Sequence, residues 1–160
     1  MGPAVTAPGG DPATPEALVI YDAECGFCRW SLAKLLAWDR GGRLRPVALQ
    51  DPEADRLLGA MSAEERMDSW HLVTPAGALR SAGAAFPPLF EPLPGGRPLA
   101  SLARRFPAAT QRVYEAVSRN RGRLGRMIPQ AAVRRADRRI RERSRAIPEP
   151  PREASGARGA

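Results

Sequence analysis

The chain has 160 residues, of which 43% are hydrophobic, and this length suits one domain with flanking extensions rather than two domains. Its two cysteines lie close together in the sequence, which excludes a scaffold held together by several disulfides. The 25 Lys and Arg residues outnumber the 17 Asp and Glu residues, giving a net charge of +8, and Lys34 is the only lysine. The positive charge is therefore almost entirely arginine.

The first predicted elements are a buried strand and a helix. Residues 1–16 are rich in Gly, Pro, Ala and Thr, and we expect them to form a disordered lead-in. Residues 18–21 are a short apolar run of strand-forming side chains, which predicts a buried central strand. After Asp22, apolar side chains recur at helical spacing from Cys28 onward, which predicts a helix that ends at Gly41.

A second strand and short helices follow. The strand is predicted over residues 43–49, and Pro46 within it predicts an edge position, because proline cannot donate to a sheet ladder. Residues 52–66 are polar and helix-forming. Within them, Ser62 and Glu65 have the spacing of a capping box, which predicts that a short helix begins there.

The middle of the chain has the pattern of a β-hairpin followed by a helix. Residues 69–74 and the residues around Leu79 are predicted strands, joined by a Pro- and Gly-containing turn. Residues 82–91 begin like a helix, which the proline pair starting at Pro87 is expected to interrupt.

The remaining predicted elements are helical. Helices are expected over residues 98–105 and 108–121, and Val113 and Val117 are placed on one apolar stripe of the second. Residues 130–146 predict an arginine-rich helix with only a thin apolar stripe. The residues after it are expected to be disordered.

This order of elements predicts an α/β fold with a mixed four-stranded sheet flanked by helices and a basic C-terminal helical extension. A thioredoxin-like fold has the same order, and its second strand lies at an edge of the sheet. We therefore expect a disordered lead-in over residues 1–16, a thioredoxin-like domain over 17–125, and an Arg-rich tail over 126–160 that is partly helical and then disordered.

The cysteine pair lies where a strand ends and a helix begins. The first turn of a helix exposes unpaired N–H groups and a partial positive charge, which stabilise a thiolate. Cys25 is the candidate nucleophile, and Cys28, one turn later, is the candidate resolving thiol. This arrangement predicts an enzyme that exchanges a dithiol with substrate disulfides.

Two alternatives use the same residues differently. Cys25 and Cys28 could bind a metal, or two chains could share a zinc ion or an iron–sulfur cluster through four cysteines. Alternatively, the cysteines are silent and the protein is a basic interaction protein. The first alternative predicts bound metal, and the second predicts salt-dependent binding to polyanions.

Asp22 and His71 are the other candidate residues near this chemistry. Asp22 is placed in the site as a proton acceptor, as a negative charge that raises the pKa of the cysteines, or as a cap that accepts hydrogen bonds from backbone N–H groups. His71 is the only histidine, and a lone histidine in a strand is expected to be packed or solvated rather than to act as a ligand or an acid–base group.

The motif Asp22-x-x-Cys25-x-x-Cys28 after an apolar strand resembles the DCC family of thiol–disulfide oxidoreductases, named after an aspartate and two cysteines at this spacing. The resemblance covers roughly residues 17–125, including the segments 38–40, 46–50, 70–73, 81–85, 113–114 and 118–121. It implies a thioredoxin-like fold and thiol–disulfide exchange, but no particular substrate. The sequence differs from thioredoxins in lacking a proline just before the third strand, where Ser69 or Trp70 stands instead.

The composition also bears on partners and location. Residues 134–145 carry positive charge that could bind nucleic acid or an anionic membrane surface. They lack the interleaved aromatic side chains that stack on bases and the broad apolar stripe that inserts into a membrane, so we expect a solvated helix. Protein or small-molecule thiols and disulfides are the expected partners, and no cofactor is expected. Residues 1–16 lack the features of a secretory signal, and no run approaches the roughly 18 apolar residues of a membrane span, so we expect a cytoplasmic protein.

Overall fold

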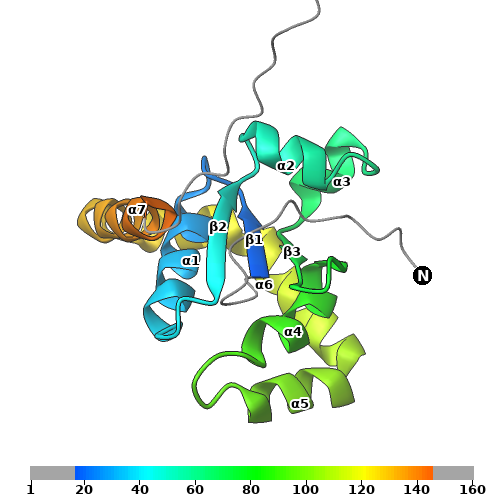
Figure 1. The fold of residues 1–160 in the computed structure, drawn as a ribbon. Helices are drawn as coiled ribbons and strands as arrows, with labels where there is room; N and C mark the ends of the chain where they lie inside the picture. Colours follow the sequence, from blue (N-terminus) through cyan, green and yellow to red (C-terminus); the bar gives the residue numbers. More distant parts are fainter. Residues whose placement is uncertain (1–16, 146–160) are drawn as a thin grey trace, which may run out of the picture.

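A computed structural model describes residues 17–145 and shows a four-stranded mixed sheet with the strand order β2-β1-β3-β4 (Figure 1). The strands are β1 (Ala17–Tyr21), β2 (Leu44–Ala48), β3 (His71–Val73) and β4 (Leu79–Ser81). β1 pairs in parallel with β2 and antiparallel with β3, and β3 pairs antiparallel with β4. The predicted α/β fold is confirmed and is consistent with a thioredoxin-like fold. The predicted disordered lead-in and the last residues of the tail lie outside the described range.

β1 is the central strand that the sequence predicted, and both of its faces are covered. Ala17 and Val19 contribute to one hydrophobic cluster, whereas Leu18 and Ile20 contribute to a second cluster. This alternation follows from the two-residue period of a strand. Pro46, on β2, pairs with Val19 of β1. Within residues 17–145, β1 is the only neighbour of β2 in the sheet, so the missing N–H of the proline leaves no ladder bond unmade.

Helices cover both faces of the sheet (Figure 1). They are α1 (Gly26–Trp38), α2 (Pro52–Leu57), α3 (Ala63–Asp68), the 3-10 helix η1 (Ala82–Ala85), α4 (Phe86–Phe90), α5 (Arg97–Arg105), α6 (Pro107–Met127) and α7 (Gln130–Arg145). Side chains from α1, α4 and α7 join the cluster that contains Val19, and side chains from α2 join the cluster that contains Ile20. The capping box predicted at Ser62 and Glu65 is present at the start of α3.

The proline pair begins a helix, so the prediction that it interrupts one was wrong. Residues Ala82–Ala85 form the 3-10 helix η1, and α4 starts at Phe86 with proline in its first turn. Proline is tolerated there because the first N–H groups of a helix have no intrahelical acceptor and the fixed φ of proline suits a helix.

The apolar stripe expected on α6 is not buried. Val113 and Val117 have 64% and 37% of their surface exposed. α6 instead approaches the core through Gln111, whose side chain accepts a hydrogen bond from the backbone N–H of Gly83 at 3.0 Å. A Cβ at Gly83 would lie 2.8 Å from the Cα of Gln111, so only glycine permits this close packing of α6 on η1.

The arginine-rich helix α7 lies against α1 (Figure 1). Its thin apolar stripe is buried, with Val133 at 6%, Ala136 at 3% and Ile140 at 6% exposure. The expectation of a merely solvated helix was therefore wrong for this face, although its outer face is exposed. The boundary predicted at residue 125 is untested, but α6 continues past it to Met127.

Asp39 joins α1, β2 and α7. Its carboxylate is 1% exposed and accepts hydrogen bonds from the backbone N–H groups of Arg43 at 3.0 Å and Leu44 at 2.8 Å. It also accepts a bond from the Nη1 of Arg143 at 2.8 Å, and the Nη2 of Arg143 donates to the carbonyls of Leu36 and Asp39. One guanidinium thus neutralises the buried charge and satisfies carbonyls at the end of α1.

His71 is fully buried in β3 and has a structural environment. Its Nε2 lies 3.1 Å from the Arg66 carbonyl, which can only accept, so this nitrogen carries the hydrogen. In the neutral ring, Nδ1 then accepts from the Ser81 hydroxyl at 2.7 Å. Burial lowers the pKa of His71 below its usual 6.5, and the bond to the Arg66 carbonyl opposes this effect. Of the two expected environments, packed or solvated, the structure shows the packed one.

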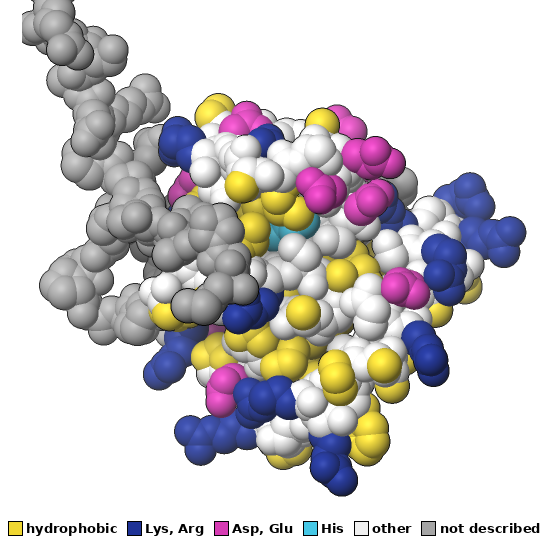
Figure 2. Space-filling model, turned by 90° about the vertical axis from the view of Figure 1, so that its right-hand side faces the viewer, with side chains coloured by type: hydrophobic (Ala, Val, Ile, Leu, Met, Phe, Trp, Pro, Cys, Tyr) yellow, Lys and Arg dark blue, Asp and Glu magenta, His cyan; other side chains and the backbone are white. Residues whose placement is uncertain are grey.

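Charged side chains gather in different places on the surface. On the face shown in Figure 2, Asp and Glu side chains concentrate toward the upper end, and Lys and Arg side chains lie mainly along the right-hand and lower edges. The acidic residues of α2 and α3 contrast with α6, in which Glu115 is the only carboxylate among several arginines.

Replacing Arg143 with Met should destabilise the protein by about 3 kcal/mol, because removing one partner of a buried ion pair leaves an uncompensated charge on Asp39. Urea unfolding of the oxidised protein measures this loss. Arg141→Met is the matched control, since Arg141 is exposed on the same helix. Equal stability of the two variants would contradict the anchoring role of Arg143.

The stability of the wild-type protein should decrease as the pH falls below about 6.5. The folded state holds His71 neutral, whereas the unfolded chain takes up a proton near pH 6.5. The stabilisation from neutral His71 is therefore complete above pH 6.5 and is lost as the pH falls through the lower pKa of the folded state. Urea unfolding between pH 7.5 and 5 should show a smaller decrease for His71→Gln, which cannot titrate. An identical pH dependence in both proteins would refute the assignment.

Candidate active site

The site lies where β1 ends and α1 begins. Cys25 is the N-cap residue of α1, with an extended backbone, and its N–H donates to the carbonyl of Asp22 at 3.4 Å. Its own carbonyl accepts from the N–H of Arg29, which closes the first helical turn. The short connection therefore places the cysteine at the positive end of α1, as the sequence predicted.

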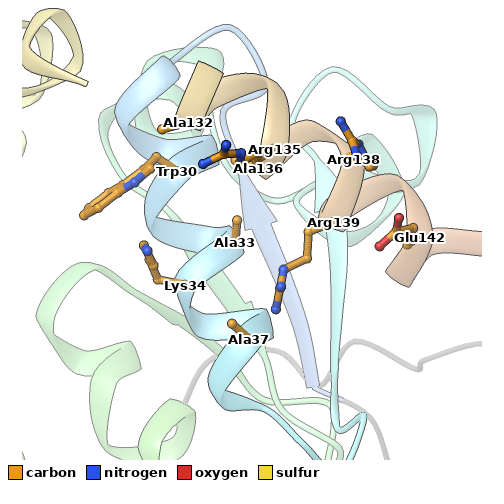
Figure 3. Close-up of a pocket in the computed structure, with 10 residues that line it drawn as sticks. All are labelled: Trp30, Ala33, Lys34, Ala37, Ala132, Arg135, Ala136, Arg138, Arg139 and Glu142. Carbon is orange, nitrogen blue, oxygen red and sulfur yellow. The ribbon is translucent and has the colours of Figure 1, made fainter. Parts of the chain in front are cut away.

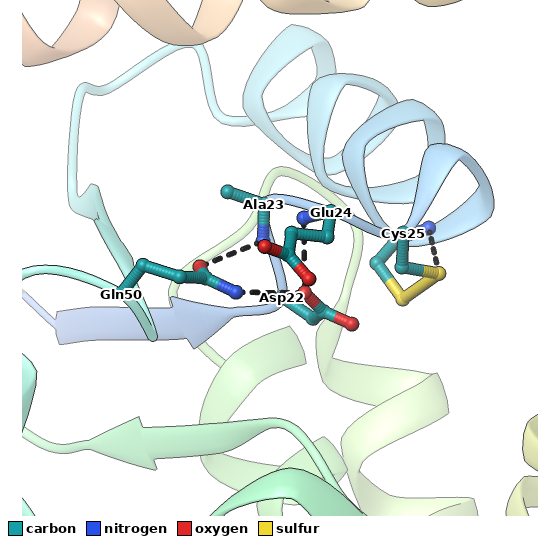
Figure 4. Close-up of a disulfide and its surroundings, with 6 residues drawn as sticks. Asp22, Ala23, Glu24, Cys25 and Gln50 are labelled. Atoms are coloured by element: carbon teal, nitrogen blue, oxygen red, sulfur yellow. Dashed lines mark hydrogen bonds between the residues drawn. A yellow bond between two sulfur atoms is a disulfide. The ribbon is translucent and has the colours of Figure 1, made fainter.

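Cys25 and Cys28 form a disulfide across this turn, with their Cα atoms 5.2 Å apart (Figure 4). The Sγ of Cys25 also accepts a hydrogen bond from the backbone N–H of Cys28 at 3.2 Å. No acidic residue lies in the first turn of α1. The geometry thus supplies an N–H donor and a helix N-terminus to the sulfur of Cys25, which are the features that stabilise a thiolate.

Asp22 holds the loop before Cys25. Its Oδ1 accepts from the backbone N–H of Glu24 at 2.9 Å, the pattern of an Asx turn, and from the side-chain amide of Gln50 at 3.0 Å (Figure 4). The same Gln50 accepts from the N–H of Ala23 at 3.2 Å. These bonds fit the capping alternative for Asp22.

Sequence reasoning missed the role of Gln50. The residue follows β2, which runs parallel to β1, and the carboxyl ends of parallel strands lie at the same edge of a sheet. A polar side chain just after β2 could therefore have been placed beside the loop that follows β1. The bond from Leu49 N–H to the Tyr21 carbonyl, at 2.8 Å, extends the pairing up to this loop.

Cys25 opens onto a groove of about 610 Å³. Residues from the start of α1, the second half of α6 and the start of α7 line it. Four of the lining residues are arginines, namely Arg29, Arg119, Arg121 and Arg126. Among residues 17–145, Glu24 is the only carboxylate that lines the groove, and Cys28 does not line it.

α7 reaches the site through Asp137. Both carboxylate oxygens of Asp137 lie 2.9 Å from the Nη1 of Arg29, one turn after Cys25. The Nε of Arg29 is buried and has no hydrogen-bond partner in the described part of the chain. Burial raises the pKa of Tyr21 at the end of β1; Asp137 adds to this effect and Arg29 opposes it. α7 thus places a carboxylate beside Arg29 and near Tyr21.

A second groove, of about 380 Å³, lies between α1 and α7 (Figure 3). Alanines on both helices form its floor, and the Nζ of Lys34 lies 5.4 Å from the centre of the Trp30 ring. Arginines of α7 also line it, but neither cysteine does. This groove is therefore separate from the disulfide.

Two further observations concern metal binding and membrane spans. Within residues 17–145, no group of three or more His, Cys, Asp and Glu side chains is arranged to hold a metal ion. None of the helices in this range is long and apolar enough to cross a membrane.

Comparison with known proteins agrees with the site geometry. A family model described as DCC1-like thiol-disulfide oxidoreductase matches residues 19–127, and the match includes the end of β1, the disulfide and α6 but not α7. Comparisons with curated proteins and with solved structures gave no match. The chain belongs to the DCC1-like thiol-disulfide oxidoreductase family.

Proposed function

We propose that Cys25 is the nucleophile and Cys28 the resolving thiol of a dithiol enzyme. One observation carries this assignment: Cys25 is the N-cap of a 13-residue helix and lines an open groove, whereas Cys28 lies one turn further and does not line it. A substrate disulfide can therefore reach the sulfur of Cys25 first. Cys28 is already within bonding distance of Cys25, as the disulfide shows.

The proposed cycle has two exchange steps. The Cys25 thiolate attacks one sulfur of the substrate disulfide, a mixed disulfide forms, and the other substrate sulfur leaves as a thiolate that takes up a proton. The Cys28 thiolate then attacks the Sγ of Cys25 and releases the second substrate thiol. The substrate gains two electrons and two protons, and the enzyme becomes the observed disulfide. The reverse sequence inserts a disulfide.

We assign Asp22 a positioning role in this cycle. Its Oδ1 is already occupied by the Glu24 N–H and the Gln50 amide, so its bonds fix the loop that presents Cys25. The partners of the enzyme are thiols and disulfides. The only cysteines of the chain are this reactive pair, which suits a compartment where thiols are kept reduced, and we propose the cytoplasm.

Redox titration should show one reversible two-electron transition of the purified protein. The free thiols are counted by mass-tagging in glutathione or dithiothreitol buffers, and the midpoint is expected between roughly −270 and −120 mV. Cys25→Ser and Cys28→Ser should each abolish the transition. Thiols that never pair, or that stay masked until a chelator is added, would instead favour the metal-binding alternative.

The two single variants should separate the roles of the cysteines. In Cys28→Ser, Cys25 still attacks a disulfide but the mixed disulfide cannot be resolved, so a stable adduct should accumulate in the mass spectrum. In Cys25→Ser, adduct formation should be at least tenfold slower, because Cys28 lacks the helix N-cap position and the open groove. Equal adduct yields would show that the assignment is wrong.

Asp22→Asn and Asp22→Ala distinguish a positioning role from proton transfer. Asn keeps an oxygen for the Glu24 N–H, so the exchange rate and its pH profile should stay close to the wild type. Ala removes that bond and should slow exchange about fivefold, the equivalent of roughly 1 kcal/mol for one hydrogen bond. A comparable loss in Asn with a shifted pH profile would instead make the charge of Asp22 essential.

A further inference from the structure

We propose that the groove beside Cys25 selects disulfides flanked by carboxylates, such as acidic peptides. This inference rests on the proposed dithiol function and adds the substrate class. Arginine recognises carboxylates through a planar fork of N–H donors. The groove brings arginines of α6 to the same open space as the sulfur of Cys25.

The charges in the groove are not all available for a substrate. Arg29 is held by Asp137 at 2.9 Å, and Arg119 lies 3.9 Å from Glu115 one turn earlier on the same helix. Arg121 and Arg126 have no hydrogen-bonded or ion-paired partner within residues 17–145. These two guanidiniums can therefore bind an incoming anion without breaking an existing pair.

Only some of the arginines of α6 line the groove. Arg121 and Arg126 line the groove, whereas Arg112 and Arg123 lie on the same helix outside it. Both pairs carry the same charge. This arrangement allows local recognition in the groove to be distinguished from the general attraction of a protein with a net charge of +8.

Glycine keeps the groove open beside the cysteine helix. A Cβ at Gly122 would have no heavy atom within 4 Å, so its side of α6 faces open space. A Cβ at Gly125 would lie 3.5 Å from the backbone nitrogen of Phe27, which shows how closely α6 approaches the start of α1. A peptide segment can thus lie along α6 and reach Cys25.

In the reaction, the arginines bind the substrate and exchange no electrons or protons with it. The peptide carboxylates pair with Arg121 and Arg126 and bring the disulfide to Cys25. The Cys25 thiolate forms a new S–S bond, the peptide S–S bond breaks, and one peptide thiolate leaves; Cys28 then releases the second peptide thiol. The dithiol is oxidised, and the peptide disulfide is reduced.

The test measures the oxidation rate of the reduced protein by symmetrical disulfides of capped tripeptides Xaa-Cys-Xaa, with Xaa as Glu, Gln or Lys. Each rate is divided by the rate of dithiothreitol with the same peptide, which removes intrinsic differences in disulfide reactivity. The wild type should react faster with the Glu peptide than with the Gln peptide, and faster with the Gln peptide than with the Lys peptide. Adding 0.3 M salt should weaken this preference, because the Debye length then falls below about 10 Å and exposed charges are screened.

The double variant Arg121→Gln/Arg126→Gln should lose about 3- to 10-fold of the rate with the Glu peptide, as expected for two partly exposed ion pairs, and less than twofold with the Gln peptide. The matched double variant Arg112→Gln/Arg123→Gln removes the same charge outside the groove and should keep the preference within twofold. An equal loss in both double variants would assign the preference to net charge and overturn the proposal.

The outcomes also separate this inference from the proposed function. If the wild type reduces all three peptides at equal normalised rates, the dithiol function stands and the acidic preference is refuted. If no peptide disulfide oxidises the protein, the proposed function itself fails. Gly122→Gln places a side chain in the groove and should slow the Glu and Gln peptides alike, relative to Gly122→Ala; unchanged rates would show that peptides do not occupy the groove.

Discussion

The buried carboxylate of Asp39 connects segments that are far apart in the sequence, and the position of α7 depends on it. Two backbone N–H groups at the start of β2 and the guanidinium of Arg143 converge on this one side chain, which is 1% exposed. A buried charge without such partners would cost several kcal/mol. Because Arg143 is near the end of α7, the ion pair fixes that helix along α1, and the buried stripe with Val133 and Ile140 completes the contact.

This docking has consequences at the opposite end of α1. There, Asp137 of α7 holds Arg29, one turn beyond Cys25, and Val133 at the start of α7 lines the groove onto which that cysteine opens. The family match ends at residue 127, so these contributions come from outside the shared region. α7 is therefore part of the environment of the disulfide, and its Asp137 compensates Arg29, whereas Arg121 and Arg126 of α6 have no such partner within residues 17–145.

The site combines two common physical devices. The helix N-terminus and the N–H of Cys28 stabilise negative charge on the sulfur of Cys25, and the loop before it is fixed by Asp22 and Gln50. In the cycle we propose, the first device favours the thiolate of Cys25 and the second fixes the loop that presents it. The basic groove adds a third feature, selection by charge. His71 takes no part in any of these, because both of its ring nitrogens are engaged within the core.

Local pattern was enough to predict the strands, the edge position of Pro46, the capping box at Ser62 and the placement of the cysteines at the start of a helix, because each depends on backbone chemistry and short-range spacing. The sequence by itself thus determined the fold class and the redox pair. Only the tertiary structure decided that α7 packs on α1, that Gln50 binds Asp22 and that α6 arginines face the groove. These features depend on contacts between distant segments. The local sequence cannot reveal them, because an arginine that anchors a helix and an arginine that faces solvent have the same local pattern.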